Sequence, residues 1–443
     1  MKLQNIAVVD MTTIMGVTQG TCILPVPLLL LALSSAITLT SAQVPSVEVN
    51  ALFELHKSTN GENWLWRNES LKGPKWDFSQ DMNGNFMENP CSSGWQGVTC
   101  SLDSHLCFNQ SCHITEINLS EYGVEGPLPK EISRLGALTA LLFETGGLNS
   151  TIPPQIGDLL NLQVLSLEYN SLTGSIPSEI GKLLKLEVLD LDDNSLTGPM
   201  PVEIGDLVSL RRLDFDNNLL TGSISSTFGK LVLLEVFDLE SNSLTGSIPS
   251  EISSWTNLER LDIERNSLSG SIPKEIGNLV ALRFIDLEHN ALTGSIPGEV
   301  GNLVRLGRLD FDNNALIGPI PSEIGNLAAL RFLDLDTNSL SGSIPSELGG
   351  LLVLEGLDLG HNALTGTVPK EISRLGNLLS CLLQSNSLMG SIDGVFDSSI
   401  QLRLSVLDLS NNLLTGNYAG DIFQLPQLQV LTLSGMSTAL ALH

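Results

Sequence analysis

The sequence predicts an α/β repeat fold, in which about 14 short repeats stack into one solenoid. Equivalent positions recur every 24 residues over eleven consecutive intervals, from Tyr122 to Asn386, and intervals of 26 and 24 residues then lead to Met436. Ten of these positions in a row, from Asn170 to Asn386, are asparagine. Each repeat also alternates apolar and polar residues over a short segment, which is typical of a β-strand. A chain of 443 residues with this regularity is predicted to form one extended repeat domain rather than several globular ones.

Residues 186–209, LEVLDLDDNSLTGPMPVEIGDLVS, illustrate one repeat, with Leu186 as position 1. Positions 4 and 6 are apolar and point inward, whereas positions 3, 5 and 7 point outward, so residues 188–192 are predicted to be a strand. Because each turn of the coil contributes one strand, the strands stack in parallel about 4.8 Å apart. A single turn cannot bury its leucines, so neighbouring turns share one core. Asn194, at position 9, is expected to face that core and to bond the backbone of adjacent turns.

The second half of the repeat is predicted to be less regular. Gly198 permits a tight turn after the strand. Pro201 has no N–H group and cannot occupy the centre of a hydrogen-bonded ladder, so the segment around it is expected to be extended but irregularly paired. Residues 202–207 are predicted to form a short turn of helix or 3₁₀-helix before the next strand.

The pattern LxxLxLxxNxLTGxIPxEIGxL resembles the plant-type leucine-rich repeat of receptor-like proteins, receptor-kinase ectodomains and polygalacturonase-inhibiting proteins. Residues 172–177 and 244–249, both LTGSIP, match the segment that is specific to this subclass. The resemblance covers residues 113–436. It implies a curved, twisted, right-handed solenoid with a parallel β-sheet on its concave face. It also implies a binding protein, either the ligand-binding half of a receptor-like protein or a soluble inhibitor of a foreign hydrolase.

The two ends of the chain carry different predictions. Residues 1–42 are predicted to be a signal peptide, because the apolar run 22–39 is followed by small residues at Thr40 and Ala42; a retained membrane anchor is the alternative. At the other end, residues 437–443 leave a repeat unfinished, so the C-terminus is expected to be truncated or uncapped. We therefore expect a secreted or cell-surface protein that contacts a membrane only through an N-terminal anchor or a missing C-terminal segment.

Residues 43–112 are predicted to cap the core at the start of the repeats. The segment SVEVNALFELHKSTNGENWLW resembles the helical cap of algal, protist and bacterial repeat proteins, and PCSSGWQGVTC resembles the cysteine-containing cap of the plant family. In an exported chain, four clustered cysteines imply two disulfides, for which three connectivities are possible; we favour the sequential pairs Cys91–Cys100 and Cys107–Cys112. Cys381 replaces a core leucine and is expected to be a buried free thiol.

Four Asn-x-Ser/Thr sequons agree with export and predict glycosylation at Asn68, Asn109, Asn118 and Asn149. All four precede residue 152. If modified, they place sugar near the cap and the first repeats.

Two acidic columns are predicted on the concave face. The position-5 column is aspartate in eight consecutive repeats, as is common in the family: Asp190, Asp214, Asp238, Asp262, Asp286, Asp310, Asp334 and Asp358. The position-7 column is carboxylate in nine consecutive repeats, where the family usually has serine: Glu144, Glu168, Asp192, Asp216, Glu240, Glu264, Glu288, Asp312 and Asp336. At position 3, arginine alternates with an apolar residue, and the columns contain Arg212, Arg260 and Arg308 with Phe284 and Phe332. This period of 48 residues indicates duplication of a two-repeat unit.

The chain has 22 basic and 49 acidic residues, a formal net charge of −27. This charge argues against nucleic acids and anionic membranes as partners and favours a basic protein or peptide, or bound cations. We predict that the ligand lies on the concave face, contacting the position-7 carboxylates from Glu168 to Asp336, with the arginines and phenylalanines of position 3 as anchors.

Catalysis is not expected, because the sequence contains no Gly-x-Ser-x-Gly, Walker or His-Glu-x-x-His motif. No cofactor is predicted. The segment DLDDN at 190–194 begins like an EF-hand loop, but Ser195 and Pro201 stand where that loop requires glycine and glutamate, so no EF-hand metal site is predicted. Loose binding of calcium between the two acidic columns remains an alternative.

Overall fold

The computed structural model describes residues 44–101, 112–416 and 421–434. The predicted signal peptide (1–42), the end of the chain (437–443), Cys107 and Asn109 lie outside these residues. Within the described part of the chain, no helix combines the length and the apolar character needed to cross a bilayer.

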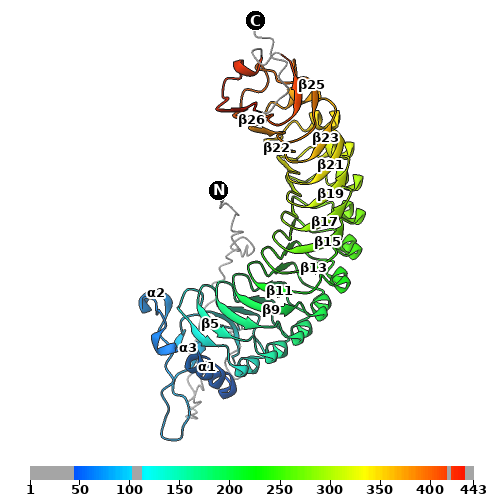
Figure 1. Cartoon of the computed structure of the whole chain (residues 1–443). Coiled ribbons are helices and arrows are strands. Elements are labelled where there is room, and N and C mark those ends of the chain that lie inside the picture. The colour runs from blue at the N-terminus through cyan, green and yellow to red at the C-terminus, as the bar shows by residue number, and fades with distance from the viewer. Residues whose placement is uncertain (1–43, 102–111, 417–420, 435–443) are drawn as a thin grey trace, which may run out of the picture. The chain divides into compact units, whose positions relative to one another are not determined.

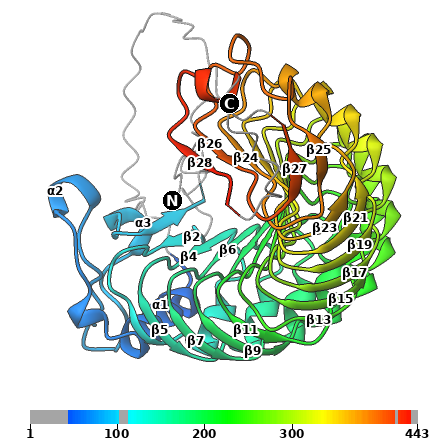
Figure 2. The same cartoon turned by 45° about the horizontal axis from the view of Figure 1, so that its top comes forward.

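A 15-stranded sheet runs along the whole stack of repeats and lies on its inner, concave side (Figures 1 and 2). Its first two strands are antiparallel, and every later pair is parallel. Neighbouring strands pair in register with a shift of 24 residues through most of the sheet, so that Leu189 lies beside Leu213 and Asp190 beside Asp214. The strands are β1 (Val98–Cys100), β2 (Ile114–Asn118), β4 (Ala140–Leu142), β6 (Val164–Ser166), β8 (Val188–Asp190), β10 (Arg212–Asp214), β12 (Val236–Asp238), β14 (Arg260–Asp262), β16 (Phe284–Asp286), β18 (Arg308–Asp310), β20 (Phe332–Asp334), β22 (Gly356–Asp358), β24 (Ser380–Leu382), β26 (Val406–Asp408) and β28 (Val430–Thr432).

The segments that follow the asparagines also form parallel sheets, which were not predicted, whereas the segment around Pro201 lacks regular pairing, as predicted. Pro201 does lie outside the ladder, as its missing N–H requires, but β9 pairs regularly before the chain reaches it. These outer strands are β3 (Glu125–Pro127), β5 (Gly147–Ser150), β7 (Ser171–Gly174), β9 (Ser195–Pro199) and β11 (Leu219–Thr221); β13 (Thr245–Gly246), β15 (Ser267–Ser271), β17 (Ala291–Gly294), β19 (Ala315–Gly318), β21 (Ser339–Ser343) and β23 (Ala363–Thr365); and β25 (Met389–Ser391) with β27 (Leu413–Thr415).

Short 3₁₀-helices return the chain to the next strand, as predicted, and most of them begin directly after a proline such as Pro201. They are η2 (Lys130–Arg134), η3 (Pro154–Asp158), η4 (Ser178–Lys182), η5 (Val202–Asp206), η6 (Ser226–Lys230), η7 (Ser250–Ser254), η8 (Lys274–Asn278), η9 (Gly298–Asn302), η10 (Ser322–Asn326), η11 (Ser346–Gly350), η12 (Lys370–Arg374) and η13 (Asp421–Gln424). These helices lie on the outer side of the stack (Figure 1).

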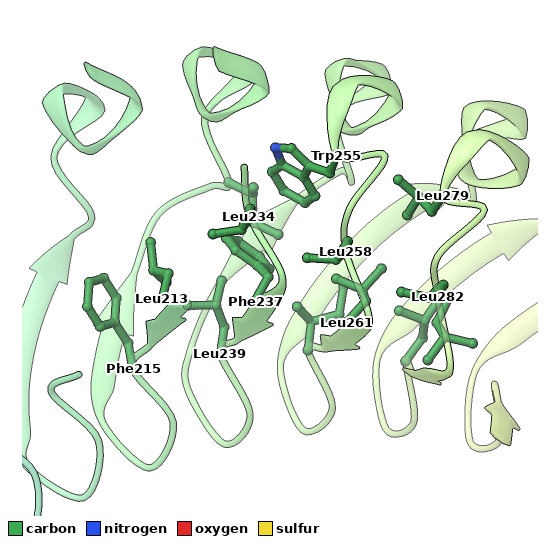
Figure 3. Packing of buried hydrophobic residues seen from close by; sticks show 14 of the residues in the cluster. Leu213, Phe215, Leu234, Phe237, Leu239, Trp255, Leu258, Leu261, Leu279 and Leu282 are labelled. Atoms are coloured by element: carbon green, nitrogen blue, oxygen red, sulfur yellow. The ribbon is translucent and has the colours of Figure 1, made fainter. Parts of the chain in front are cut away.

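One continuous apolar core joins all the repeats. Figure 3 shows part of it, where Leu213, Phe237 and Leu261 from successive strands lie in one row. The asparagine column holds the turns together as predicted: Asn194 donates to the carbonyl oxygen of Leu167 at 3.0 Å and accepts from the amide of Leu172 at 2.9 Å, both in the preceding repeat. Cys381 is a fully buried free thiol, also as predicted, and burial raises its pKa to about 12.

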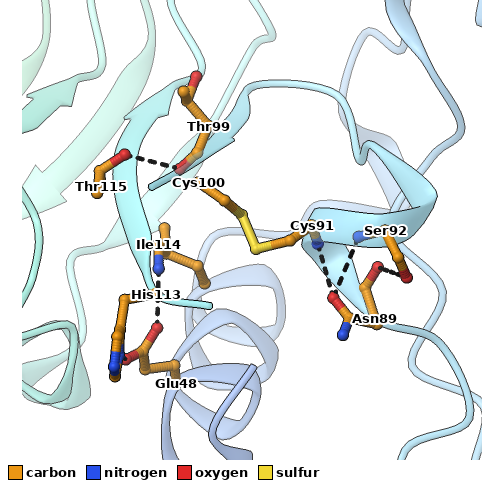
Figure 4. Close-up of a disulfide and its surroundings, with 9 residues drawn as sticks. All are labelled: Glu48, Asn89, Cys91, Ser92, Thr99, Cys100, His113, Ile114 and Thr115. Atoms are coloured by element: carbon orange, nitrogen blue, oxygen red, sulfur yellow. Dashed lines mark hydrogen bonds and ion pairs between the residues drawn. A yellow bond between two sulfur atoms is a disulfide. The ribbon is translucent and has the colours of Figure 1, made fainter. Parts of the chain in front are cut away.

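The segment before the repeats contains α1 (Ser46–Ser58), η1 (Gly61–Asn63), α2 (Glu69–Lys72) and α3 (Pro90–Ser93). The predicted disulfide Cys91–Cys100 is present and ties α3 to β1 (Figure 4). Cys112 is also disulfide-bonded, and its predicted partner Cys107 lies outside the described residues. Glu48 of α1 accepts the amide of Ile114 at 2.9 Å, which joins this segment to the first repeat strand (Figure 4).

Candidate ligand-binding face

The two acidic columns both lie along the concave sheet, but they are not equally accessible. The position-5 aspartates end the strands and are buried: Asp190, Asp214, Asp238, Asp262, Asp286 and Asp310 are each exposed by 5% or less. The prediction that position 5 points outward concerns direction alone, and in the structure little of this column is open to solvent. Alternation along a strand gives the direction of a side chain but not what covers it, and neighbouring side chains cover these.

The buried aspartates have a structural role. The side chain of each accepts the backbone N–H two residues later, where the strand ends, for example Glu288 to Asp286 at 3.1 Å and Asp336 to Asp334 at 3.1 Å. This local hydrogen bond satisfies an amide at the strand end. The position-5 column is thus part of the frame that presents position 7.

The arginines of position 3 each bridge two buried aspartates from consecutive repeats. Arg212 contacts Asp190 at 3.0 Å and Asp214 at 2.5 Å. The same arrangement recurs 48 and 96 residues later, in the pairs Arg260 with Asp238 and Asp262, and Arg308 with Asp286 and Asp310. One guanidinium per two repeats therefore serves two carboxylates, which gives the 48-residue period a physical meaning beyond duplication.

The two phenylalanines predicted as anchors differ in setting. Phe284 lies between two arginines, with the guanidinium of Arg260 4.1 Å from its ring centre and that of Arg308 at 5.7 Å. This stacking favours a cation–π interaction within the protein. Phe332 is 37% exposed and lies beside Arg331. Of the two rings, Phe332 is the more exposed.

The position-7 carboxylates form the outermost acidic row of this face, at half-buried to nearly buried positions. The residue after each, at position 8, adopts a left-handed conformation, with φ of 45° at Asp193 and 49° at Arg265. This turn brings the position-8 side chain beside the carboxylate row. Arg265 was not predicted from the sequence, because position 8 lies beyond the strand.

Arg265 serves three glutamates of the row. Its guanidinium is 2.5 Å from Glu264 and 3.6 Å from both Glu240 and Glu288, which come from three consecutive repeats. Two histidines at the same position do similar work: His289 contacts Glu288 at 2.6 Å, and His361 contacts Asp336 at 2.8 Å.

Burial and mutual repulsion raise the pKa values of several carboxylates in each column. At position 5, burial and the charge of Asp238 raise the pKa of Asp214 to about 9, and burial and Asp310 raise that of Asp286 to about 9. At position 7, burial and the charges of Asp190 and Glu168 raise the pKa of Asp192 to about 8. The face therefore carries less negative charge at neutral pH than the formal count implies, unless cations compensate it.

Asp192, like Asp312, has a buried carboxylate oxygen without a hydrogen-bond partner among the described residues. Asp192 is 8% exposed. Carboxylate oxygens of Glu168, Asp190 and Asp192 lie within 4.8 Å of one another, and so do those of Asp192, Asp193 and Asp216. Similar clusters occur elsewhere in the row, for example at Glu288, His289 and Asp312.

Three of the predicted glycosylation sites are described, and all are exposed. Asn68 precedes α2, Asn118 ends β2, and Asn149 lies in β5. Their exposure is compatible with modification, which stays a prediction.

Family models for the leucine-rich repeat match residues 161–231, 233–292 and 305–375, the first and last of these as three consecutive single repeats each. Among solved structures, the plant peptide hormone receptor RGFR1 in complex with RGF2 is 34% identical, with 72% of this chain aligned to 58% of that one and a TM-score of 0.62. The ectodomain of the Arabidopsis thaliana receptor kinase GASSHO1/SCHENGEN3, in complex with CASPARIAN STRIP INTEGRITY FACTOR 2, is 32% identical, with 87% aligned to 47% and a TM-score of 0.68.

A leucine-rich-repeat protein of Leptospira interrogans is 32% identical over 73% of this chain and 91% of its own, with a TM-score of 0.53. The chain therefore belongs to the leucine-rich-repeat family, and its repeats are of the plant type. It spans 47 to 58% of the length of three plant receptor chains that it matches. No curated protein sequence matches the chain.

Proposed function

We propose that the protein is an extracellular recognition protein that binds a protein or peptide ligand on its concave face, with the position-7 row as its contact surface. The observation that carries the proposal is the row itself, nine carboxylates in successive repeats where the family usually has serine. Two of the related receptor ectodomains are complexes with a peptide hormone or a named factor. Binding, rather than catalysis, is the role that these relatives support.

We further propose that the ligand is basic. The row from Glu168 to Asp336 contains eight carboxylates, and among the described residues Arg265 is the one arginine or lysine paired with it. A lysine- or arginine-rich segment that follows the row would replace protons and solvent ions as counter-charge. Such complementarity chiefly sets the association rate and the choice of partner.

The test measures binding of a basic peptide to the full chain by surface plasmon resonance across a salt series. In the triple variant Asp216→Ser, Glu240→Ser, Glu264→Ser, we expect the affinity to fall at least about tenfold and the salt dependence to flatten. The matched control removes three exposed glutamates from the outer 3₁₀-helices, Glu251→Ser, Glu299→Ser and Glu323→Ser, and should change neither. Equal losses in both variants would mean that only net charge matters, and no loss in the first would reject the row as the interface.

A further inference from the structure

The N-terminal part of the position-7 row lacks the counter-charges that the rest of the row has. No ion pair between described residues involves Glu168, Asp192, Asp193 or Asp216, whereas the next three carboxylates along the row share Arg265. Arg212, the nearest arginine of position 3, is already bonded to Asp190 and Asp214. Four acidic side chains of this stretch therefore face one another without a paired base.

The burial of Asp192 makes this imbalance costly. Asp192 is 8% exposed, and its buried Oδ1 receives no hydrogen bond from the described residues. A buried carboxylate oxygen without a partner loses its hydration and gains nothing in return. Guanidinium groups meet this need for several buried aspartates of position 5, as Arg260 does for Asp238 and Asp262.

The oxygens around Asp192 have the spacing of cation ligands. Those of Glu168, Asp190 and Asp192 lie within 4.8 Å of one another, and those of Asp192, Asp193 and Asp216 do as well. Calcium binds oxygen at 2.3–2.6 Å, so two ligands of one ion are at most about 5 Å apart. Asp192 belongs to both groups; Glu168 comes from the preceding repeat and Asp216 from the following one, whereas Asp190 and Asp193 lie in the same repeat as Asp192.

We propose that Asp192 is the central ligand of a divalent-cation site on the concave face, which is completed by one of its two neighbouring pairs, Glu168 with Asp190 or Asp193 with Asp216. The ion is of the calcium type, because calcium accepts several carboxylates in an irregular arrangement, whereas magnesium requires a near-ideal octahedron. Water completes the coordination from the open side. This site differs from an EF-hand, since its ligands come from successive turns of the solenoid and not from one loop.

The experiment is a titration of the chelator-treated full chain with calcium chloride, by isothermal calorimetry and by thermal unfolding, at about pH 8.5, above the pKa of about 8 of Asp192. We expect saturable binding and a rise in Tm of roughly 5 °C. Absence of both up to about 10 mM calcium, which is beyond the range of weak extracellular calcium sites, would overturn the proposal. Magnesium chloride in a parallel titration is expected to bind at least about tenfold more weakly.

The isosteric variant Asp192→Asn tests whether Asp192 is a cation ligand or only a buried acid. Without calcium, the variant is expected to melt at a higher temperature than the native chain, because an uncompensated carboxylate is gone. With calcium, the order reverses, because only the native chain gains stability, and the affinity of the variant falls at least about tenfold. Unchanged calcium affinity in the variant contradicts the proposal.

Three further variants complete the design. Glu168→Gln and Asp216→Asn test the two sides of the site, and at least one of them should weaken binding severalfold. The control is Asp336→Asn, the same kind of change in the same row at a carboxylate that His361 already contacts. It should leave calcium affinity unchanged, and a loss equal to that of Asp192→Asn would assign the binding to the row as a whole and reject a discrete site.

Discussion

Two stretches of the position-7 row have the same spacing and the same number of carboxylates, yet they differ in whether a basic side chain pairs with those carboxylates. In the first, Glu168, Asp192 and Asp216 have no ion-pair partner among the described residues; in the second, Glu240, Glu264 and Glu288 share the guanidinium of Arg265. The residue equivalent to Arg265 in the first stretch is Asp193, with nearly the same backbone conformation. A single flanking position therefore decides whether the carboxylates of three repeats share an internal counter-charge or have none among the described residues.

The largest expected effect is that of pH on the native chain in the presence of a chelator. Asp192 and Asp214 are buried, and their pKa values of about 8 and about 9 lie well above the ordinary value of 3.8. The folded chain therefore binds protons that the unfolded chain releases, so the free energy of unfolding should rise as pH falls from about 9 to about 5 and decrease as pH rises through 8 to 9. We expect a gain of about 3 kcal/mol on acidification, measured by urea denaturation. Stability that peaks near pH 8 would contradict the uncompensated state of the first stretch.

The second prediction converts the compensated stretch into the uncompensated one. Arg265→Asp removes the guanidinium shared by three glutamates and adds a fourth acid, as in the first stretch. We expect the free energy of unfolding at pH 7.5 to fall by about 2 kcal/mol, because each of three partly exposed pairs contributes less than about 1 kcal/mol. The control Arg283→Asp removes a pair with Glu259 at the exposed edge and should cost less than about 1 kcal/mol. Equal losses would show that an arginine at position 8 stabilises the chain no more than one at the exposed edge.

The third prediction makes the opposite change. Asp193→Arg places a guanidinium beside Asp192 and Asp216, as Arg265 is placed beside its glutamates. We expect a gain of about 1 kcal/mol in the free energy of unfolding and a weaker dependence of stability on pH. The variant should also lose its response to calcium, which Asp206→Arg, on the outer side of the stack, should retain. A calcium response that survives Asp193→Arg would show that the cation site lies outside this stretch.

The repeat architecture could be predicted from the sequence almost completely. The 24-residue period, the leucines and the asparagine column each have one physical solution in a stacked coil, and Asn194 bonds the adjacent turn as expected. The Cys91–Cys100 disulfide was also predicted, as the first of two sequential pairs among the four clustered cysteines. The outer sheets were missed because a proline such as Pro201 argues against a ladder, although it excludes only its own position.

The placement of the acidic columns along the concave sheet was predictable, but their surroundings were not, and that they bind a ligand stays a prediction. The carboxylate row and the three arginines lie on the concave face, as predicted. Burial of the position-5 column was not predictable from alternation, because it depends on side chains that reach across from neighbouring repeats, such as Arg212 onto Asp190. The role of Arg265 depends on a left-handed turn that no strand pattern encodes. Both features arise between repeats and therefore cannot be read within a single one.

The arginine that serves two aspartates has a consequence for how the chain can change its length. Loss of the repeat between Arg212 and Arg260 would leave both arginines competing for Asp214, and gain of one repeat there would leave one buried aspartate with none. Only even numbers of repeats can be inserted or deleted in this region without breaking the pattern. Natural or engineered variants of different length are therefore expected to differ by an even number of repeats in this region.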